Sequence, residues 1–246
     1  MNLVYPKMSK ATNIKNVNVP KIIHQTWKSE NYPKHFLPFV KSWIKYHPEW
    51  EYRLWTDTMN RDFIKEKYPF FLEVFDSYPF NIQRVDAIRY FILYHYGGLY
   101  VDLDSEAFCE VDSYLMGDED CFLIKESDQQ SDLHDMNFII SNAFMACPPK
   151  SQFFWEIILD LVSYKSHAKD INTLVLETTG PFMLTRVYNE YHRKHCVKLL
   201  DNGIIFPLSA EEAELVLTTK EISYEIRKKM DNACAVHYYY GTWWRK

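Results

Sequence analysis

Apolar residues along the chain repeat at two spacings, one typical of strands and one typical of helices. The β-branched apolar run at 19–27 predicts a buried strand, and the alternating residues 50–55 predict a second. Further strands are predicted at 99–101, 121–125, 137–146, 197–206 and 235–240. Helical spacing covers 36–44, 58–78 with a break near Pro69, 80–96, 151–164, 181–193 and 219–230. Strands interleaved with helices in this way predict an α/β fold with a mainly parallel central sheet.

The longest predicted helix, 80–96, leads directly into the most informative part of the sequence. Its apolar stripe consists of Ile82, Val85, Ile88 and Ile92, and the pair Gly97-Gly98 ends it as a left-handed cap would. The chain has only 6 glycines in 246 residues, so we expect each to stand where the backbone needs one.

The chain reads as one domain. Residues 1–18 are polar and rich in Asn and Lys, which predicts a loose N-terminal arm, and 19–246 carry the alternating strands and helices. No internal repeat or low-complexity segment interrupts this region. The length of 246 residues is enough to bury a sizeable core.

Composition and charge exclude several classes of protein. The net charge is −5 and no long basic run occurs, so we expect no nucleic-acid partner. No apolar stretch reaches the ~18 residues of a membrane span, and the N-terminus lacks the apolar core of a signal peptide. The 5 cysteines are odd in number and form no CxxC pair, which predicts reduced thiols in a cytoplasmic protein.

Two aspartates, Asp102 and Asp104, directly follow the apolar strand at 99–101. In extended backbone, residues i and i+2 project to the same side, and the carboxyl end of a strand is where ligands bind in open α/β sheets. Two hard oxygen ligands suit Mn²⁺ or Mg²⁺, and such an ion can neutralise a leaving diphosphate. The alternative is a solvated acidic turn without a function.

The helix before this motif carries Asp86 and Arg89, which share one face at a spacing of three residues. A surface salt bridge is one interpretation, and such pairs contribute little. The other is a pair that holds sugar hydroxyls, because a carboxylate accepts hydrogen bonds and a guanidinium donates them.

A phosphatase of the haloacid-dehalogenase type also places a D-x-D after an apolar strand, with the first Asp, here Asp102, as the nucleophile. In this chain Ser105-Glu106 follows the motif instead of Gly-Thr. The acidic run 117–120 comes too soon after the motif to leave room for the crossovers of that fold. The phosphatase is therefore the weaker alternative.

Several motifs together resemble the DXD-containing glycosyltransferases grouped as family 32, and their order covers about residues 20–244. This family includes initiating α-1,6-mannosyltransferases, inositol-phosphoceramide mannosyltransferases and capsular-polysaccharide transferases. The matching segments are PKIIHQTW at 20–27, SW at 42–43 with PEWEYRLW at 48–55, DAIRY at 86–90, GGLYVDLD at 97–104, SNAFMA at 141–146, TGP at 179–181, His237 and WW at 243–244.

The resemblance implies a GT-A fold, with a Rossmann-like, mainly parallel sheet, and retaining transfer from a nucleotide sugar. It implies a catalytic set of Asp86, Arg89, Asp102, Asp104 and Asn142. The implied donor-binding set is Ile23, Gln25, Trp27, Asp86, Arg89, Tyr100, Asp102, Trp243 and Trp244. The implied metal ligands are Asp102, Asp104 and His237, and an imidazole beside two carboxylates favours Mn²⁺ over Mg²⁺.

Some of these residues also have a structural interpretation. Trp27 and His237 fit a core position, Asn142 fits a hydrogen bond at a strand end, and Trp243 and Trp244 can simply pack the C-terminus.

The sequence thus predicts a metal-dependent retaining glycosyltransferase that moves a hexose from a UDP- or GDP-sugar to a saccharide or glycolipid acceptor. We expect a cytoplasmic enzyme of bacterial or viral type. The sequence is also compatible with peripheral contact between this enzyme and a membrane. Residues 58–78, 110–136 and 151–195 are expected to shape the acceptor site. A degenerate protein that binds a nucleotide sugar without turnover is the non-enzymatic alternative.

Overall fold

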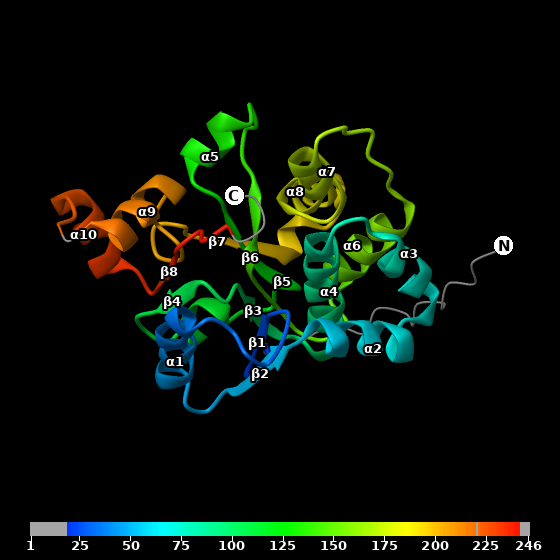
Figure 1. Cartoon of the computed structure of the whole chain (residues 1–246), viewed down its shortest axis with the longest axis horizontal. Helices are drawn as coiled ribbons and strands as arrows, with labels where there is room; N and C mark the ends of the chain where they lie inside the picture. Colours follow the sequence, from blue (N-terminus) through cyan, green and yellow to red (C-terminus); the bar gives the residue numbers. More distant parts are fainter. Residues whose placement is uncertain (1–18, 220, 242–246) are drawn as a thin grey trace.

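A computed structural model describes residues 19–219 and 221–241 and shows a six-stranded sheet with helices on both faces (Figure 1). The strand order is β2-β1-β3-β6-β5-β7. The strands are β1 (Ile22–Thr26), β2 (Glu51–Trp55), β3 (Gly98–Val101), β5 (Cys121–Lys125), β6 (Ile140–Cys147) and β7 (Val197–Leu200). The α/β class predicted from the sequence is confirmed.

The sheet is mixed rather than purely parallel. β1 pairs in parallel with both β2 and β3, and β5 pairs in parallel with β7. β6 runs antiparallel to β3 on one side and to β5 on the other, so β6 is the reversed strand of this sheet. The carboxyl ends of β1 and β3 therefore lie side by side at one edge, where the predicted aspartates follow β3.

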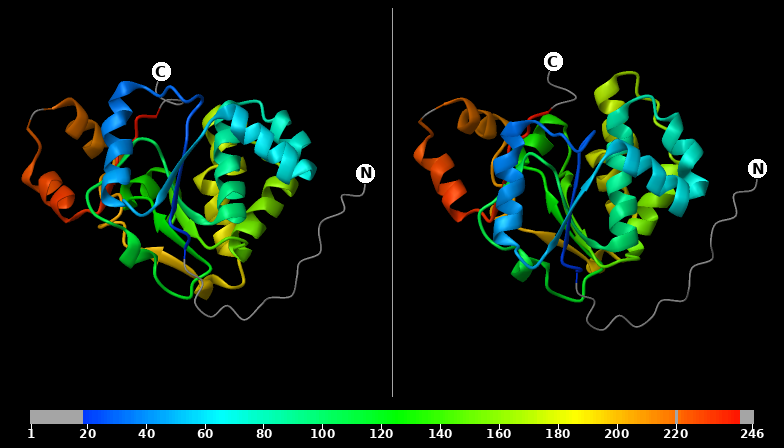
Figure 2. Two further views of the ribbon diagram at one scale, coloured as in Figure 1. Left: turned by 90° about the horizontal axis from the view of Figure 1, so that it is seen from below. Right: turned by 60° about the horizontal axis from the view of Figure 1, so that its bottom comes forward.

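Helices form the two outer layers (Figure 2). One layer holds α2, α3, α4, α6, α7 and α8, and α1, α9 and α10 lie on the other side. The helices are α1 (Leu37–Tyr46), α2 (Asp57–Lys67), α3 (Leu72–Ser77), α4 (Asn81–Tyr96), α5 (Asp128–Leu133), α6 (Gln152–Ser163), α7 (Ile171–Thr178), α8 (Pro181–Glu190), α9 (Ala210–Thr218) and α10 (Tyr224–Asn232). Burial of apolar side chains on both faces of the sheet supplies the main stabilisation.

Helix α4 is more deeply buried than its sequence pattern predicts. The stripe of isoleucines and valine predicts one apolar face. In the structure, nine side chains of this helix are buried, and polar ones such as Asp86 and Arg89 are among them. The helix lies between the sheet and its neighbours α2 and α6, so tertiary packing covers its remaining faces. Polar groups buried in this way need partners, which the site below supplies.

The turn from α4 into β3 requires both of its glycines. Gly97 and Gly98 have φ values of 66° and 95°, which other residues rarely adopt. A Cβ on Gly98 would lie 2.6 Å from the carbonyl oxygen of Ile22, and one on Gly97 would lie 2.7 Å from the nitrogen of Pro149. Gly97 therefore caps α4 with positive φ as predicted, although its ψ of −159° differs from that of a left-handed helical cap. The absence of a Cβ at Gly98 lets β3 pair closely with β1.

Several elements were not predicted. The short strand β4 (Ser105–Ala107) and helices α5, α7 and α9 have no counterpart in the sequence pattern. Of the short strands predicted near 197–206, the structure shows β7 and a single bridge from Ile205 to Ala235. These elements are short and have mixed polarity, so tertiary contacts decide them rather than periodicity. The last strand, β8 (Ala235–His237), is shorter than the predicted 235–240.

β4 and β8 form a separate two-stranded antiparallel sheet, in which Ser105 pairs with His237. A disulfide joins Cys109, just after β4, to Cys234, just before β8. The prediction that all cysteines are reduced is therefore wrong for this pair, because the two thiols lie 125 residues apart in sequence and only folding brings them together. Cys121, Cys147 and Cys196 are free.

Among the described residues, no helix is both long and apolar enough to cross a membrane. The predicted N-terminal arm at 1–18 lies outside the described residues.

We expect reduction of the Cys109–Cys234 disulfide to destabilise the protein. The bond closes a long loop, and its loss increases the entropy of the unfolded chain, so the free energy of unfolding should fall by about 2–4 kcal/mol. Urea unfolding with and without reductant, and of the Cys109→Ser/Cys234→Ser double variant, measures this loss. Cys196→Ser is the control and should leave the midpoint nearly unchanged. Equal midpoints with and without reductant would contradict the expectation.

Candidate active site

The two aspartates lie in the turn that joins β3 to β4. The carbonyl oxygen of Asp102 accepts hydrogen bonds from Ser105 Oγ at 2.6 Å and from Gln25 Nε2 at 3.1 Å, which hold the turn against β1. Leu103 points into the core between them and is 5% exposed. Asp102 and Asp104 thus project to the same side, as their spacing predicts, and both carboxylates are only partly exposed.

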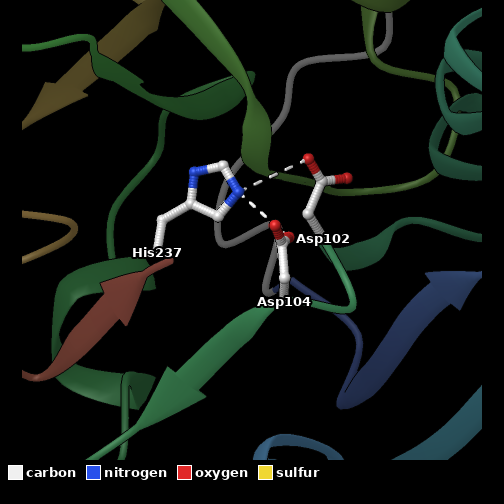
Figure 3. A group of neighbouring side chains, drawn as sticks. All are labelled: Asp102, Asp104 and His237. Atoms are coloured by element: carbon white, nitrogen blue, oxygen red, sulfur yellow. Dashed lines mark hydrogen bonds and ion pairs between the residues drawn. The ribbon is translucent and has the colours of Figure 1, made fainter. Parts of the chain in front are cut away.

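His237 completes a cluster with these aspartates (Figure 3). Its Nε2 lies 3.0 Å from Asp104 Oδ1 and 4.0 Å from Asp102 Oδ2. The antiparallel pairing of β4 with β8 places His237 opposite Ser105, the residue after Asp104. The structure therefore brings together the three residues predicted as metal ligands, although 133 residues separate Asp104 from His237.

Charge interactions within the cluster are strong because it is largely buried. Burial alone would lower the pKa of His237, but the carboxylate of Asp104 outweighs it and raises this pKa to about 9. Burial likewise works against ionisation of Asp104, and the contact with His237 outweighs it and lowers the pKa of Asp104 below its ordinary value. Without a metal, His237 is therefore a cation paired with Asp104.

The donor atoms of the cluster fit a divalent cation. One oxygen of each carboxylate and one imidazole nitrogen all lie within 4.8 Å of one another, and this mixed set suits Mn²⁺. The backbone N–H of Tyr240 donates to the other oxygen of Asp104 at 2.8 Å and orients that carboxylate, as outer partners of metal ligands do. A metal bound here would replace the proton of His237.

Asp86 and Arg89 form a buried ion pair, with Arg89 Nη2 2.9 Å from Asp86 Oδ1. The two side chains are 7% and 4% exposed, so the surface salt bridge that the sequence left open is wrong. Arg89 Nη1 also donates to Asp102 Oδ1 at 3.1 Å and to the carbonyl oxygen of Asn142 at 2.8 Å. The guanidinium therefore connects the helix α4 pair to the acidic turn.

The protonation of this pair follows from its burial. Burial raises the pKa of Asp86 to about 7, and the charge of Arg89 opposes part of that rise. For Arg89, burial favours the neutral form, but Asp102 outweighs this effect and holds the pKa above its ordinary value. Arg89 thus stays charged between two carboxylates.

Asn142, in β6, contacts this pair through its side chain. Its Nδ2 donates to Asp86 Oδ1 at 3.1 Å, so the amide serves the network from within β6 rather than from a strand end. Thr179 Oγ1 donates to Asp86 Oδ2 at 3.3 Å, and Tyr90 donates its hydroxyl to the carbonyl oxygen of Thr179 at 2.8 Å. Sequence reasoning assigned no role to Tyr90 or Thr179, although the TGP motif at 179–181 was the available signal.

The predicted donor-binding residues lie in different environments. Tyr100 donates its hydroxyl to Asp102 Oδ1 at 2.8 Å and lies under the guanidinium of Arg89, whose central carbon is 4.6 Å from the ring centroid. Ile23 is 1% exposed and packs in the core, and Gln25 is fully buried between Asp102 and Tyr52. Trp27 is half-buried against Phe36. Trp243 and Trp244 lie outside the described residues.

The neighbours of His237 were missed by sequence reasoning. The rings of Phe206 and Tyr239 lie 5.2 and 4.1 Å from its imidazole, measured between centroids. Both residues have positive φ, 64° and 49°, which is a strained backbone for aromatic residues. No local pattern predicts positive φ in such residues, so the sequence held no signal for them.

The chain is similar in sequence to proteins of a known family. Residues 33–121, which include α4 and the acidic turn, match the family described as "Glycosyltransferase sugar-binding region containing DXD motif". Inositol phosphoceramide mannosyltransferase 2 of Schizosaccharomyces pombe is 41% identical over 177 residues, which are 72% of this chain and 48% of that protein. Mannosyl phosphorylinositol ceramide synthase SUR1 of Saccharomyces cerevisiae is 38% identical over 71% of this chain and 43% of its own length. The chain thus spans about half the length of these relatives.

A likeness to a solved structure supports the fold. The PaToxG glycosyltransferase superposes with a TM-score of 0.51 at 14% sequence identity and covers 87% of this chain and 84% of its own. The fold is that of the GT-A glycosyltransferases. More narrowly, the chain belongs to the DXD-containing glycosyltransferases, so the family resemblance predicted from the sequence is confirmed.

The raised pKa of His237 predicts a pH dependence of stability in the metal-free protein. Because this pKa rises from 6.5 to about 9 on folding, the contribution is fully present below pH 6.5 and is lost as the pH rises through about 9. In EDTA, His237→Gln should therefore lower the free energy of unfolding by about 3 kcal/mol more at low pH than above pH 9. Denaturant unfolding across this range measures the difference.

The matched control is Asp104→Asn, which removes the charge that raises this pKa. Asp102 and Glu126 raise this pKa less than Asp104 does, so in that background the pH-dependent part of the His237→Gln effect should shrink. A constant loss across the range in both backgrounds would show that His237 contributes packing alone.

Proposed function

We propose that this glycosyltransferase uses a divalent metal and transfers a mannosyl group from a nucleotide-diphosphate sugar. The observation that carries the proposal is the contact of Arg89 with Asp102, 3.1 Å between Nη1 and Oδ1. It joins a buried group of hydrogen-bonding side chains, Asp86, Arg89 and Asn142, to a cluster suited to a metal. A diphosphate sugar needs both, side by side.

Each group has a distinct role in this proposal. Asp102, Asp104 and His237 would hold the cation, which would supply positive charge to the departing diphosphate. Arg89 donates to donor oxygens, and Asp86 and Asn142 fix the sugar hydroxyls. Because Asp86, Arg89 and Asn142 are held by one another in the absence of a ligand, little reorganisation is needed when the sugar binds.

The donor and acceptor classes are inferred from the relatives. Their names describe mannosyl transfer to inositol phosphoceramide, and identities of 38% and 41% support the same donor sugar here. We therefore propose a mannose donor, carried on GDP or UDP, and an acceptor that presents a hydroxyl on a glycolipid or saccharide head group. The retaining outcome is proposed from the family resemblance.

The disulfide bears on where the enzyme acts. Disulfides persist in oxidising compartments and are rare in the cytoplasm of mesophiles. The Cys109–Cys234 bond therefore favours an oxidising compartment over the cytoplasmic location expected from the number and spacing of the cysteines.

Two alternatives from the sequence have less support. The family match and the fold favour glycosyl transfer over a phosphatase with Asp102 as nucleophile. A degenerate nucleotide-sugar-binding protein would not need the complete set that the structure assembles, in which both aspartates, the histidine and the Asp86–Arg89 pair are present.

Donor hydrolysis tests the proposal directly. Purified protein with a panel of UDP- and GDP-sugars should release free nucleotide from a mannose donor in Mn²⁺, and EDTA should abolish the release. Asp104→Asn should slow it about 100–1,000-fold, because the variant removes a charged ligand at the leaving group.

Asp231→Asn, on the exposed surface of α10, is the matched control and should hydrolyse the donor at the wild-type rate. Full activity of Asp104→Asn, or activity that survives EDTA, would overturn the metal-dependent mechanism. Nucleotide binding without release, even with acceptors added, would favour the degenerate protein.

The stereochemistry of transfer is a separate expectation. A retaining enzyme should give an α-linked product from an α-linked donor, and the one-bond carbon–proton coupling at the anomeric carbon distinguishes this from inversion. A β-linked product would contradict the retaining assignment and leave the metal site unaffected.

A further inference from the structure

A cavity of about 490 Å³ lies beside the candidate metal cluster, between the start of α5, the segment that precedes α9 and the start of α9. Its volume is in the range of small-ligand sites, about 300–1,000 Å³. The two helices are joined across it by a hydrogen bond from Gln129 Nε2 to Glu211 Oε2 at 3.0 Å. Figure 1 shows α5 and α9 on the side of the molecule where β8 ends.

The cavity and the metal cluster share a wall. Phe206 lines the cavity, and its ring stacks on the imidazole of His237 at 5.2 Å with an interplanar angle of 28°. The backbone N–H of Phe206 donates to the carbonyl oxygen of Ala235 at 2.9 Å, which fixes this segment on β8. The positive φ of Phe206 is a strain that the fold maintains at this wall, and such strain concentrates at functional sites.

A second connection runs through Glu126. Its carboxylate accepts a hydrogen bond from the hydroxyl of Tyr239, whose ring contacts His237, and its backbone carbonyl accepts one from Asn202 Nδ2. Asn202 and Ser127, the residue after Glu126, both line the cavity. Residues that border the cavity are thus tied to the strand that carries His237.

The cavity and the proposed donor-sugar groups contact different members of the cluster. Arg89, with Asp86 and Asn142, contacts Asp102, whereas Phe206 contacts His237. Figure 3 shows Asp102 and His237 on opposite sides of the cluster. A donor held at Asp102 and a ring held beyond His237 would approach the metal cluster from two directions.

The lining favours a neutral, polyhydroxylated ligand. Asp128, Glu211, Gln129 and Asn202 offer carboxylate and amide groups, and Phe206 adds an apolar ring. Such groups bind hydroxyls that both donate and accept. A phosphate is disfavoured because the cavity is rich in carboxylates and its lysine, Lys229, is paired with Glu212 at 2.6 Å.

We propose that this cavity is the acceptor subsite and takes a polyhydroxylated six-membered ring, a cyclitol or a sugar. The inference rests on the proposed function. A hydroxyl oxygen of this ring forms the new bond to the anomeric carbon of the donor, the bond from that carbon to the diphosphate breaks, and the nucleoside diphosphate leaves with the electron pair and takes up the hydroxyl proton.

Cavity variants of the full chain test the proposal, with myo-inositol and methyl α-mannoside as the probes. Saturation-transfer NMR in Mg²⁺ measures ring binding, and steady-state kinetics measures KM for each probe and for the donor. Gln129→Trp, which fills the cavity from an exposed position, should abolish the NMR signal. Asp128→Ala should raise KM for the ring about tenfold while KM for the donor changes less than twofold.

Asp231→Ala is the matched control, because Asp231 is an exposed carboxylate of helix α10 and does not line the cavity. It should behave as the wild type in both measurements. Circular dichroism and the unfolding midpoint of each variant confirm that it is folded.

The outcomes separate this inference from the proposed function. If the wild type hydrolyses the donor but the cavity variants bind and use the ring as the wild type does, or if neither ring binds, the acceptor subsite is wrong and the proposed function stands. If the wild type neither hydrolyses nor binds any donor, the proposed function is wrong. The acceptor role of the cavity is then wrong as well, even if the ring still binds there.

Discussion

The structure depends on one buried cation, the guanidinium of Arg89. It lies 2.9 Å from Asp86 and 3.1 Å from Asp102, and its side chain is 4% exposed. Burial of a charge is costly unless it is paired and fully hydrogen-bonded, and here two carboxylates, a backbone carbonyl and the ring of Tyr100 surround it. The same contacts orient Asp102 towards Asp104 and His237. The ion pairs that stabilise the buried charge of α4 therefore also position the candidate site.

The second constraint is the pairing of β4 with β8. This short sheet carries the acidic turn on one strand and His237 on the other, and the Cys109–Cys234 bond closes its far end. Two strands of three residues each are marginal by themselves, so the disulfide and the packing of Phe206 and Tyr239 hold His237 in position. The candidate metal cluster is thus made from the turn after β3 of the central sheet and from β8, the last strand of the described residues.

The accuracy of sequence reasoning differed between elements for physical reasons. The strands β1, β2, β3 and β5 and helices α1, α4 and α6 follow clear periodicities or end at glycine or proline, and they were predicted nearly where they occur. Helices α5, α7 and α9 are short, with mixed polarity, and their positions depend on contacts with distant segments. The apolar stripe of α4 predicts fewer buried side chains than the structure shows. The pattern gives the apolar residues of the helix, but it does not give the number of neighbouring elements that pack around it.

The sequence by itself determined the fold class, the family and the acidic turn, because these depend on local spacing: two aspartates after a strand, an aspartate and an arginine three residues apart, and a glycine pair that ends a helix. Only the tertiary structure decided that Asp86 and Arg89 are buried, that Cys109 and Cys234 are joined, and that Phe206, with its positive φ, lies between His237 and a polar cavity. Each of these facts joins segments that are distant in sequence, and such contacts follow from the packing of the whole chain rather than from any local pattern.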